Sequence, residues 1–449
     1  MKFLKYTIIL LVMSSSACNV TPDFVKPTVN IPSKWRDENL ITKKTTDEQK
    51  WWQAFGSSKL NQLINQSIFY NNDLAIARQR VEQAKAQIKI AGANLFPQLG
   101  IQGNTAHNID EMGEVSKQNT NFTVSYEVDL WGRNRAAKSA GENRFLSEVF
   151  AKNALQLVVM SNVGQTYFNL LALDERKKIA IDFLKNVTDV LTIIDARFKA
   201  GAVSELDVVQ QKTEQANARA SLDLLNQQYA LAENALAILI GQPPQSAGMM
   251  ESFYDVQTPE FALLQPVNLL ERRPDIKQIE MELLAANADI GIARAAFYPK
   301  LQLNLDAILA SPQPTGIAAS LMAGLVQPIF QGERLDGNLE YTTARQTELV
   351  ETYRRIVLIA FKEVEDAAAI RTNSNHRLKM FSESVDNAQQ SYQLSLERYR
   401  LGLIDYQALL TTQRTLLSSQ NNRVQARQDV MIALVLLYQA LGGGFQYQL

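Results

Sequence analysis

The stretch Arg398-Tyr399-Arg400-Leu401-Gly402-Leu403-Ile404-Asp405-Tyr406 decides the fold, because it recurs earlier as Arg197-Phe198-Lys199-Ala200-Gly201-Ala202-Val203-Ser204-Glu205. In each copy one long helical pattern ends and another begins. A glycine suits this point, because it adopts the left-handed conformation that other residues resist. The two copies therefore predict two helical hairpins with tip turns at Gly201 and Gly402, and an internal duplication.

The duplication extends over most of the chain. Asn72-Asp73-Leu74 opens a helix that closes at Phe96-Pro97, and Pro274-Asp275-Ile276 opens a helix that closes at Tyr298-Pro299. Leu239-Ile240-Gly241 ends the first copy and Ala440-Leu441-Gly442 ends the second. We predict a signal peptide over 1–17, an extended arm over 18–56, repeat 1 over 57–241 with strands within 97–130, a connector over 242–271, repeat 2 over 272–442 with strands within 299–330, and a tail over 443–449.

The composition excludes some classes of function. The chain has 449 residues with 45 basic and 46 acidic side chains, so it has no footprint for nucleic acid. After the N-terminus, no apolar run is long enough for a membrane-spanning helix.

The N-terminus has the features of a targeting segment. Lys2 and Lys5 precede the apolar run 6–13, and small residues lead to Cys18, the one cysteine of the chain. The segment resembles a bacterial lipoprotein signal with a lipid-modified cysteine, although Ser15 stands where leucine is commoner. Asn19, which follows the cysteine, permits transfer to the outer membrane in enteric-type sorting. The alternative is a free thiol.

Between the arm and the first strand we predict one helix over roughly 57–94. The arm itself is broken by Pro22, Pro27 and Pro32, and the folded body is expected to begin at Trp51-Trp52 and Phe55.

The pattern then changes to strict alternation. In residues 121–130 every second side chain is apolar, and residues 301–309 repeat this pattern, which predicts strands with one apolar face. A weaker alternation begins at Leu99, and a less regular strand is expected over 316–330. We expect a polar link at 107–119 and a tight turn at 311–316. Four strands of about ten or more residues match a tilted bilayer crossing, and the alternative is a small water-soluble sheet that caps a helical bundle.

Long helices are predicted after each strand pair. Residues 135–197 and 332–398 contain no proline, and about sixty residues of helix reach roughly 90–100 Å. The return helices carry apolar residues spaced by seven, which indicates coiled-coil packing: Leu224, Leu231 and Ile238 in repeat 1, and Leu410, Leu417, Val424, Met431 and Tyr438 in repeat 2. The companion positions are polar, namely Gln413, Gln420 and Arg427.

The sequence offers no basis for catalysis or for a cofactor. The two histidines, His107 and His376, have no metal-ligand spacing around them, and no glycine-rich phosphate loop is present. We interpret the carboxylates Glu363, Glu365 and Asp366 as a solvated helix face. The prediction is a protein that is not an enzyme.

The chain resembles the TolC-like outer-membrane efflux factors, in the lipoprotein branch that serves resistance-nodulation-division multidrug pumps. The resemblance covers the mature chain, and its residues are Trp51-Trp52, Asn72-Asp73-Leu74, Phe96-Pro97, Asp129-Leu130-Trp131-Gly132-Arg133, Arg272-Arg273-Pro274-Asp275-Ile276, Phe297-Tyr298-Pro299 and both tip sequences. It implies a mainly α protein with a membrane β-barrel, in which a homotrimer shares twelve strands. It also implies two partners, a periplasmic membrane-fusion (adaptor) protein and an inner-membrane resistance-nodulation-division transporter.

The resemblance further implies a periplasmic gate at the tips. One contact in relatives matches Tyr399 and Asp207, and Arg197, Arg398 and Asp405 are further gate candidates. Acidic residues that ring the aperture in relatives correspond to Ala408 and Thr411, so this ring is missing or displaced, and Asp405 and Glu205 are the nearest acidic residues.

The resulting hypothesis is a passive exit duct in the outer membrane for drugs and other small amphiphilic compounds, in contact with outer-membrane lipid. The alternatives are the channel of a heavy-metal cation efflux system, an outer channel for secreted polypeptides, and a lipid-anchored structural coiled-coil protein without a pore.

Overall fold

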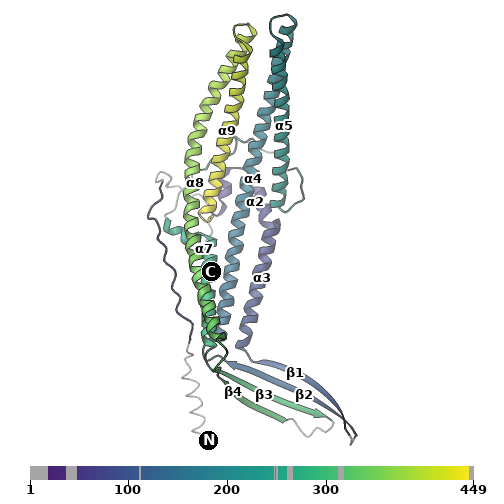
Figure 1. Cartoon of the computed structure of the whole chain (residues 1–449), viewed down its shortest axis with the longest axis vertical. Coiled ribbons are helices and arrows are strands. Elements are labelled where there is room, and N and C mark those ends of the chain that lie inside the picture. The colour runs from purple at the N-terminus through teal and green to yellow at the C-terminus, as the bar shows by residue number, and fades with distance from the viewer. Residues whose placement is uncertain are drawn as a thin grey trace. The chain divides into compact units, whose positions relative to one another are not determined.

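A computed structural model describes residues 19–36, 48–110, 113–246, 248, 251–259, 266–311 and 318–443, and Figure 1 shows its helices and strands. The chain divides into two compact units. Unit one comprises residues 1–29, 77–152 and 275–356, and unit two comprises residues 30–76, 153–274 and 357–449. The predicted signal peptide, Cys18, nearly all of the predicted turn at 311–316 and nearly all of the tail lie outside the described residues.

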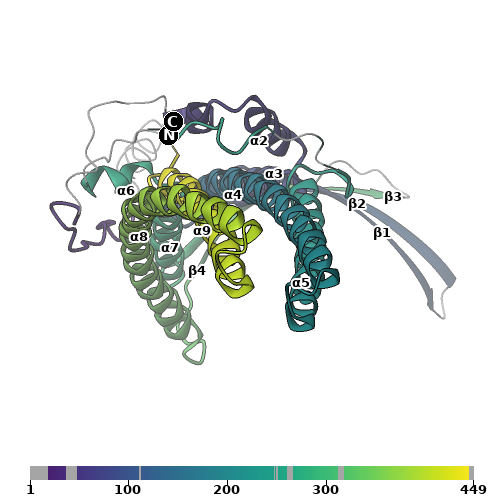
Figure 2. The same cartoon turned by 90° about the horizontal axis from the view of Figure 1, so that it is seen from above.

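The element order confirms the duplication. Each repeat contains a helix, two strands, a long helix and a return helix: α3 (Asn72–Gly92), β1 (Gln98–Asp110), β2 (Gly113–Val128), α4 (Arg133–Lys199) and α5 (Glu205–Leu239), then α7 (Pro274–Ala295), β3 (Lys300–Ser311), β4 (Ala318–Val326), α8 (Arg334–Arg400) and α9 (Tyr406–Ala440). The two long helices have 67 residues each and the two return helices have 35 each. Figures 1 and 2 show α5 beside the end of α4, and α9 beside α8.

Short elements lie outside this repeated pattern. Before α3 come η2 (Glu48–Phe55) and α2 (Ser58–Tyr70), between α3 and β1 lies η3 (Ala93–Leu95), and before α7 come η4 (Pro266–Asn268) and α6 (Leu269–Arg272). The structure corrects the single helix predicted over 57–94, because α2 ends at Tyr70 and α3 begins at Asn72. Asn71 lies between them with an extended backbone, and its side-chain oxygen accepts a hydrogen bond from the Leu74 amide at 3.1 Å. Asparagine at this position favours a new helix start over continuation.

The end of each return helix contacts the residues where its repeat begins. A Cβ on Gly241 would lie 2.0 Å from the Tyr70 carbonyl oxygen, and a Cβ on Gly442 would lie 2.7 Å from the Arg272 carbonyl oxygen. Both glycines have positive φ. The side chains of Asn71 and Arg273 donate to the carbonyls of Leu239 and Ala440, at 3.0 and 2.9 Å. Main-chain carbonyls that lack helical partners at the end of each return helix are thereby satisfied.

The core of unit two gathers around η2. Trp51 and Phe55, where the folded body was expected to begin, are fully buried, and Trp51 stacks on Tyr438 of α9 with ring centroids 5.1 Å apart. Phe55 packs on Phe168 of α4 at 5.0 Å. The body of unit two therefore holds α9 against α4 through aromatic side chains.

The four strands form one antiparallel sheet in the order β1-β2-β3-β4. The register sorts side chains by polarity: Val124 lies opposite Leu99 and Leu305, whereas Thr123 lies opposite Asp306. Because side chains alternate between faces, one face of the sheet is apolar and the other is largely polar. This confirms the predicted alternation.

The structure also corrects two strand boundaries. Residues 107–110 and 113–119, predicted as part of a link, belong to β1 and β2, and the strand predicted to reach residue 330 ends at Val326. Residues 107–110 and 113–116 pair through backbone hydrogen bonds, which do not require an apolar pattern in the sequence.

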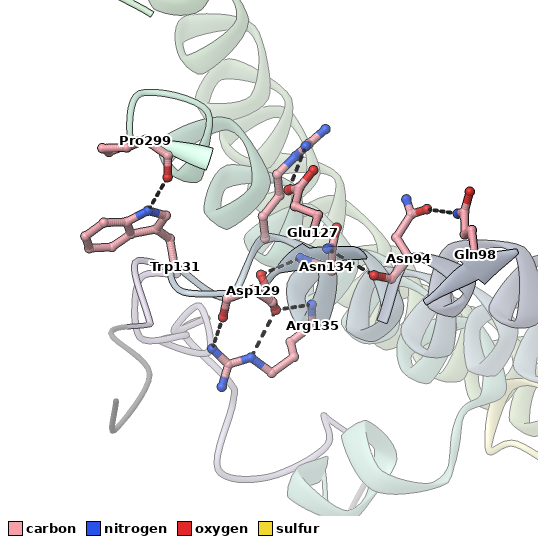
Figure 3. Close-up of polar contacts among 9 residues, drawn as sticks. Asn94, Gln98, Glu127, Asp129, Trp131, Asn134, Arg135 and Pro299 are labelled. Carbon is pink, nitrogen blue, oxygen red and sulfur yellow. Dashed lines mark hydrogen bonds and ion pairs between the residues drawn. The ribbon is translucent and has the colours of Figure 1, made fainter. Parts of the chain in front are cut away.

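The junction between the sheet and the helices is a polar network (Figure 3). The Asp129 carboxylate accepts from the backbone amides of Asn134 and Arg135 at 3.1 and 3.0 Å, and so caps the first turn of α4. Arg135 also forms an ion pair with this carboxylate at 3.1 Å. The Trp131 indole donates to the Pro299 carbonyl at 2.8 Å and stacks on Tyr298, which joins the end of β2 to the start of β3.

The sorted register predicts a sharp difference between adjacent positions. Lysine in place of Val124, on the apolar face, is expected to cost about 2–4 kcal/mol of unfolding free energy if the site lies near the bilayer centre. Denaturant unfolding in lipid vesicles measures this cost. Thr123→Lys is the matched control and is expected to cost far less, and equal costs at both positions would contradict the assignment of faces.

Candidate functional site

The two tip turns have the same backbone geometry. Gly201 and Gly402 have φ of 73° and 75°, and the amides that follow them donate to the carbonyls of Arg197 and Arg398, each at 2.9 Å. This 6→1 bond with a left-handed glycine is a Schellman ending, and it satisfies carbonyls that the helix leaves free. The predicted tip turns are therefore present in both repeats.

Beneath the tips, the two hairpins share an apolar cluster. Its buried members come from all four hairpin helices: Val190, Ile194, Val208, Ala388, Tyr392, Tyr399, Tyr406, Leu409, Leu410 and Leu416. The hairpins are thus in direct contact within one chain, and any movement of one relative to the other must separate these side chains.

Arg197 and Tyr399 connect the hairpins at the level of the turns. The Arg197 guanidinium donates to the Tyr399 carbonyl at 2.7 Å and lies 4.9 Å from the centre of the Tyr399 ring. A cation over an aromatic face is attractive, more so where water is excluded. Two predicted gate residues are therefore brought together.

Asp207 has a different partner from the one expected. Its carboxylate accepts from the Ser204 amide at 3.1 Å, and the Asp207 amide donates to the Ser204 hydroxyl at 3.3 Å, which is a capping box at the start of α5. The buried Tyr399 hydroxyl has no hydrogen-bond partner among the described residues. Burial raises the pKa of the Tyr399 phenol, the Arg197 charge opposes this shift, and the nearby Asp207 charge adds to it.

The other predicted tip residues lie on exposed surface. Asp405 caps α9 by accepting from the Ala408 amide at 2.8 Å, and the Thr411 hydroxyl donates to the Gln407 carbonyl at 2.8 Å. The Arg398, Glu205 and Ala408 side chains are exposed. Asp405 and Asp207 thus both stabilise helix starts.

A set of polar side chains joins α5 to α9 farther from the turns, and sequence reasoning missed it. We call Gln211, Glu214, Tyr406 and Arg414 the cross-hairpin contacts. The Tyr406 hydroxyl donates to the Gln211 side-chain carbonyl at 2.7 Å, and the Gln211 amide donates to the Val187 carbonyl at 2.7 Å. The Arg414 guanidinium makes two hydrogen bonds of 3.2 Å to the Glu214 carboxylate.

Burial of Glu214 determines how much free energy the loss of its partner would cost. The Glu214 side chain is only 8% exposed, whereas that of Arg414 is 58% exposed. A buried carboxylate that loses its cation is left unpaired, which is costly. The sequence held one signal, because Glu214 and Arg414 follow their tip glycines at nearly the same distance and carry opposite charges.

The heptad positions behave differently in the two repeats. Val424, Met431 and Tyr438 of α9 are buried, as predicted, but Leu224, Leu231 and Ile238 of α5 are 53%, 59% and 65% exposed. In this single chain the apolar stripe of α5 therefore has no coiled-coil partner along the described helices. Of the polar companions, Gln413 is buried, and Arg427 donates to the carbonyls of Phe253, Tyr254 and Val256.

The predicted solvated carboxylates include two with tertiary roles. Glu363 pairs with the buried Arg273 at 2.6 Å, and Glu365 accepts from the Arg36 amide at 3.0 Å. Asp366 pairs with Lys362, one turn away on the same exposed helix face. The described part of the chain holds no group of three or more potential metal ligands. Among the described helices, none combines the length and apolar character needed to cross a membrane.

Comparison with known proteins places these features in context. The family model described as outer membrane efflux protein matches residues 63–242 and 266–443. The pyoverdine export outer membrane protein OpmQ of Pseudomonas aeruginosa is 35% identical, over 96% of this chain and 94% of that protein. The toluene efflux pump outer membrane protein TtgI of Pseudomonas putida is 31% identical, over 99% of both chains.

Solved structures share the fold. A crystal structure of CusC, from a study of folding and transmembrane channel formation, superimposes with a TM-score of 0.85 at 26% identity and covers 95% of this chain and all of that one. The open state of the MtrE outer membrane channel of Neisseria gonorrhoeae gives 0.86 at 25% identity, with 95% and 98% covered.

The tip tyrosines predict a loss of stability in alkali. Burial raises the pKa of Tyr406 and Tyr399 above the ordinary value near 10. A phenol whose pKa is higher when folded contributes stability that is complete below about pH 10 and is lost as pH rises toward the folded pKa. We therefore expect tip stability to be flat from about pH 6 to 9 and to fall above about pH 10.

Absorbance of tyrosinate together with circular dichroism checks this expectation. The buried phenols should ionise only as helix is lost, and Tyr406→Phe should weaken the alkaline sensitivity. Free ionisation near pH 10 with intact helices would contradict the burial of the two tip phenols.

Proposed function

The chain belongs to the outer membrane efflux protein family, and from this premise we propose that it is the exit duct of a tripartite efflux system with a latch at the helix tips. As a member of this family it is an outer-membrane efflux channel and performs no catalysis. The observation that carries the latch proposal is the set of side-chain contacts between the two hairpins, close to their tip turns.

The open sheet supports a shared barrel. A four-stranded sheet with one apolar face leaves β1 and β4 as unpaired edges, and unpaired backbone in lipid is very costly. Four strands are too few to close a barrel alone. Three chains with four strands each would close a barrel of twelve. The exposed apolar stripe at Leu224, Leu231 and Ile238 supplies a surface for a neighbouring chain.

The partners follow from the duct role. A passive channel needs an energised pump in the inner membrane and a protein that bridges the periplasm, so the proposed partners are a resistance-nodulation-division transporter and a membrane-fusion protein. Relatives named for pyoverdine, solvent and toluene export favour small organic cargo, either amphiphilic or apolar. Leu401 and Leu403 at one tip are 74% and 69% exposed, which suits contact with a bridging protein.

The latch consists of Arg197 with Tyr399 and of the cross-hairpin contacts. Asp207 and Asp405 stabilise the helix starts, so their removal would fray the tips as well as loosen the latch. Arg398 and Thr411 face solvent and are available to partners. Opening would separate α9 from α5 and expose the Glu214 carboxylate to water.

Removing the ion pair should open the channel. In Glu214→Gln with Arg414→Gln, each chain loses about 1–2 kcal/mol of closing free energy, because the carboxylate is buried but the cation is half exposed. That is roughly a 5–30-fold shift in population. Conductance in planar bilayers is expected to rise, and cells that lack the pump should become more sensitive to large antibiotics.

The control is Lys362→Gln with Asp366→Asn, an exposed pair on α8 whose loss should leave conductance unchanged. An intact oligomer of the Glu214 and Arg414 double variant with wild-type conductance would rule out this pair as a latch.

We also propose that Cys18 is the first residue of the mature protein and carries acyl chains. A single acyl chain binds membranes only marginally. Several acyl chains on Cys18, together with the sheet, would give a firm anchor. Mass spectrometry of the mature N-terminus is expected to show a lipidated Cys18, and an unmodified thiol or cleavage elsewhere would refute the anchor. Cys18→Ser should keep part of its membrane association through the sheet.

A further inference from the structure

The buried side chains of α9 include an amide without a partner. Gln413 is 2% exposed, and neither its side-chain nitrogen nor its side-chain oxygen has a hydrogen-bond partner among the described residues. Because the side chain is covered within one chain, a neighbouring chain cannot reach these atoms. A buried amide that loses its bonds to water and gains no others raises the free energy of the state that buries it.

Two other buried glutamines of the described chain are paired. Gln211 of α5 is 0% exposed, and its amide group both accepts from the Tyr406 hydroxyl and donates to the Val187 carbonyl. Gln428 of α9 is 7% exposed and donates to a side chain of α4 at 2.9 Å. Burial of a glutamine in these helices is therefore normally accompanied by hydrogen bonds, and Gln413 is the exception.

Gln413 lies on the face of α9 that packs against the other hairpin. Leucines three or four residues away on either side share this face: Leu409, Leu410, Leu416 and Leu417. The first three belong to the apolar cluster beneath the tips, and the fourth packs on a second cluster that contains residues of α4 and α5. The unpaired amide thus occupies a position within an apolar contact.

A polar cavity of about 230 Å³ adjoins Gln413. Its lining comes from α4, α8 and α9 and includes the polar side chains of Asn186, Gln389, Tyr392 and Gln420. A polar cavity of this size has room for several water molecules, which occupy about 30 Å³ each in the liquid. The polar atoms of Gln413 are buried from this space. Water would reach them only after α9 moves.

We propose that Gln413 is a release residue of the latch, whose unpaired amide raises the free energy of the closed state and becomes hydrated from the adjoining cavity when the hairpins separate. This proposal rests on the latch of the proposed function. The cross-hairpin contacts favour closure, whereas Gln413 favours opening. The closed state is therefore held by a smaller margin than its apolar contacts alone would give.

Replacement of Gln413 by methionine tests the sign of this effect. Methionine is similarly long and flexible, and it has no group that requires a hydrogen bond in a core. Gln413→Met should therefore lower the population of the locally opened tip by about tenfold. Native-state hydrogen exchange of amides 409–420 measures this population, and these amides should exchange about tenfold more slowly than in the wild type. Basal conductance in planar bilayers should fall.

Gln211→Met is the matched control. It makes the same chemical change at an equally buried glutamine on the other hairpin, but it leaves the Tyr406 hydroxyl without its acceptor. Amides 409–420 should then exchange about tenfold faster, and basal conductance should rise. The two variants are thus expected to shift the same equilibrium in opposite directions.

The results separate a failure of this inference from a failure of the latch. Exchange in Gln413→Met that is no slower than in the wild type would overturn the inference. Slower exchange without lower conductance would also overturn it, because Gln413 would then affect tip stability alone. If Gln211→Met raises conductance while Gln413→Met leaves it unchanged, the latch stands and only the release role is lost. If neither variant changes conductance in an intact oligomer, the latch itself is refuted.

Discussion

The structure depends on the closure of each repeat against its own beginning. Gly241 and Gly442 lie so close to the carbonyls of Tyr70 and Arg272 that any side chain would collide with them. The end of each return helix therefore packs against the backbone that precedes the first helix of its own repeat. The lengths of α4 and α8 are equal, as are those of α5 and α9, so both repeats turn back after the same number of residues.

Along α9 the character of the packing changes. From Val430 to Leu437 the helix is buried on nearly all sides against the aromatic core of unit two. Nearer the tip, the exposed side chains of Gln407, Ala408 and Arg414 alternate with buried ones. One end of the return helix is thus fixed by close packing, and the other is held by a smaller apolar cluster and by directional side-chain bonds. Such bonds can be exchanged for water at low net cost, whereas a packed aromatic core cannot.

Much of this fold could be predicted from local patterns. Duplicated tips, alternation in residues 121–130 and proline-free helical runs each leave a signal in neighbouring residues. The break at Asn71 was missed because the apolar helical pattern continues past it, although this asparagine caps the next helix. The strand residues at 107–110 and 113–119 were missed because their pairing uses backbone groups. The exposed stripe on α5 was interpreted as packed, since periodicity does not reveal which chain supplies the partner. At the site, the tip glycines could be anticipated, but Tyr399 was expected to pair with Asp207 and instead contacts Arg197. The contacts of Glu214 and Tyr406 could not, because they depend on the register between helices.

Native-state hydrogen exchange along α9 is the most direct test of the account. If packing fixes one end and side-chain contacts latch the other, amides from about residue 430 to 440 should exchange only with global unfolding. Amides from about residue 409 to 420 should exchange through local opening at a clearly lower free energy. Uniform protection along the whole helix would contradict the account, because α9 would then be a single rigid element without a separable tip.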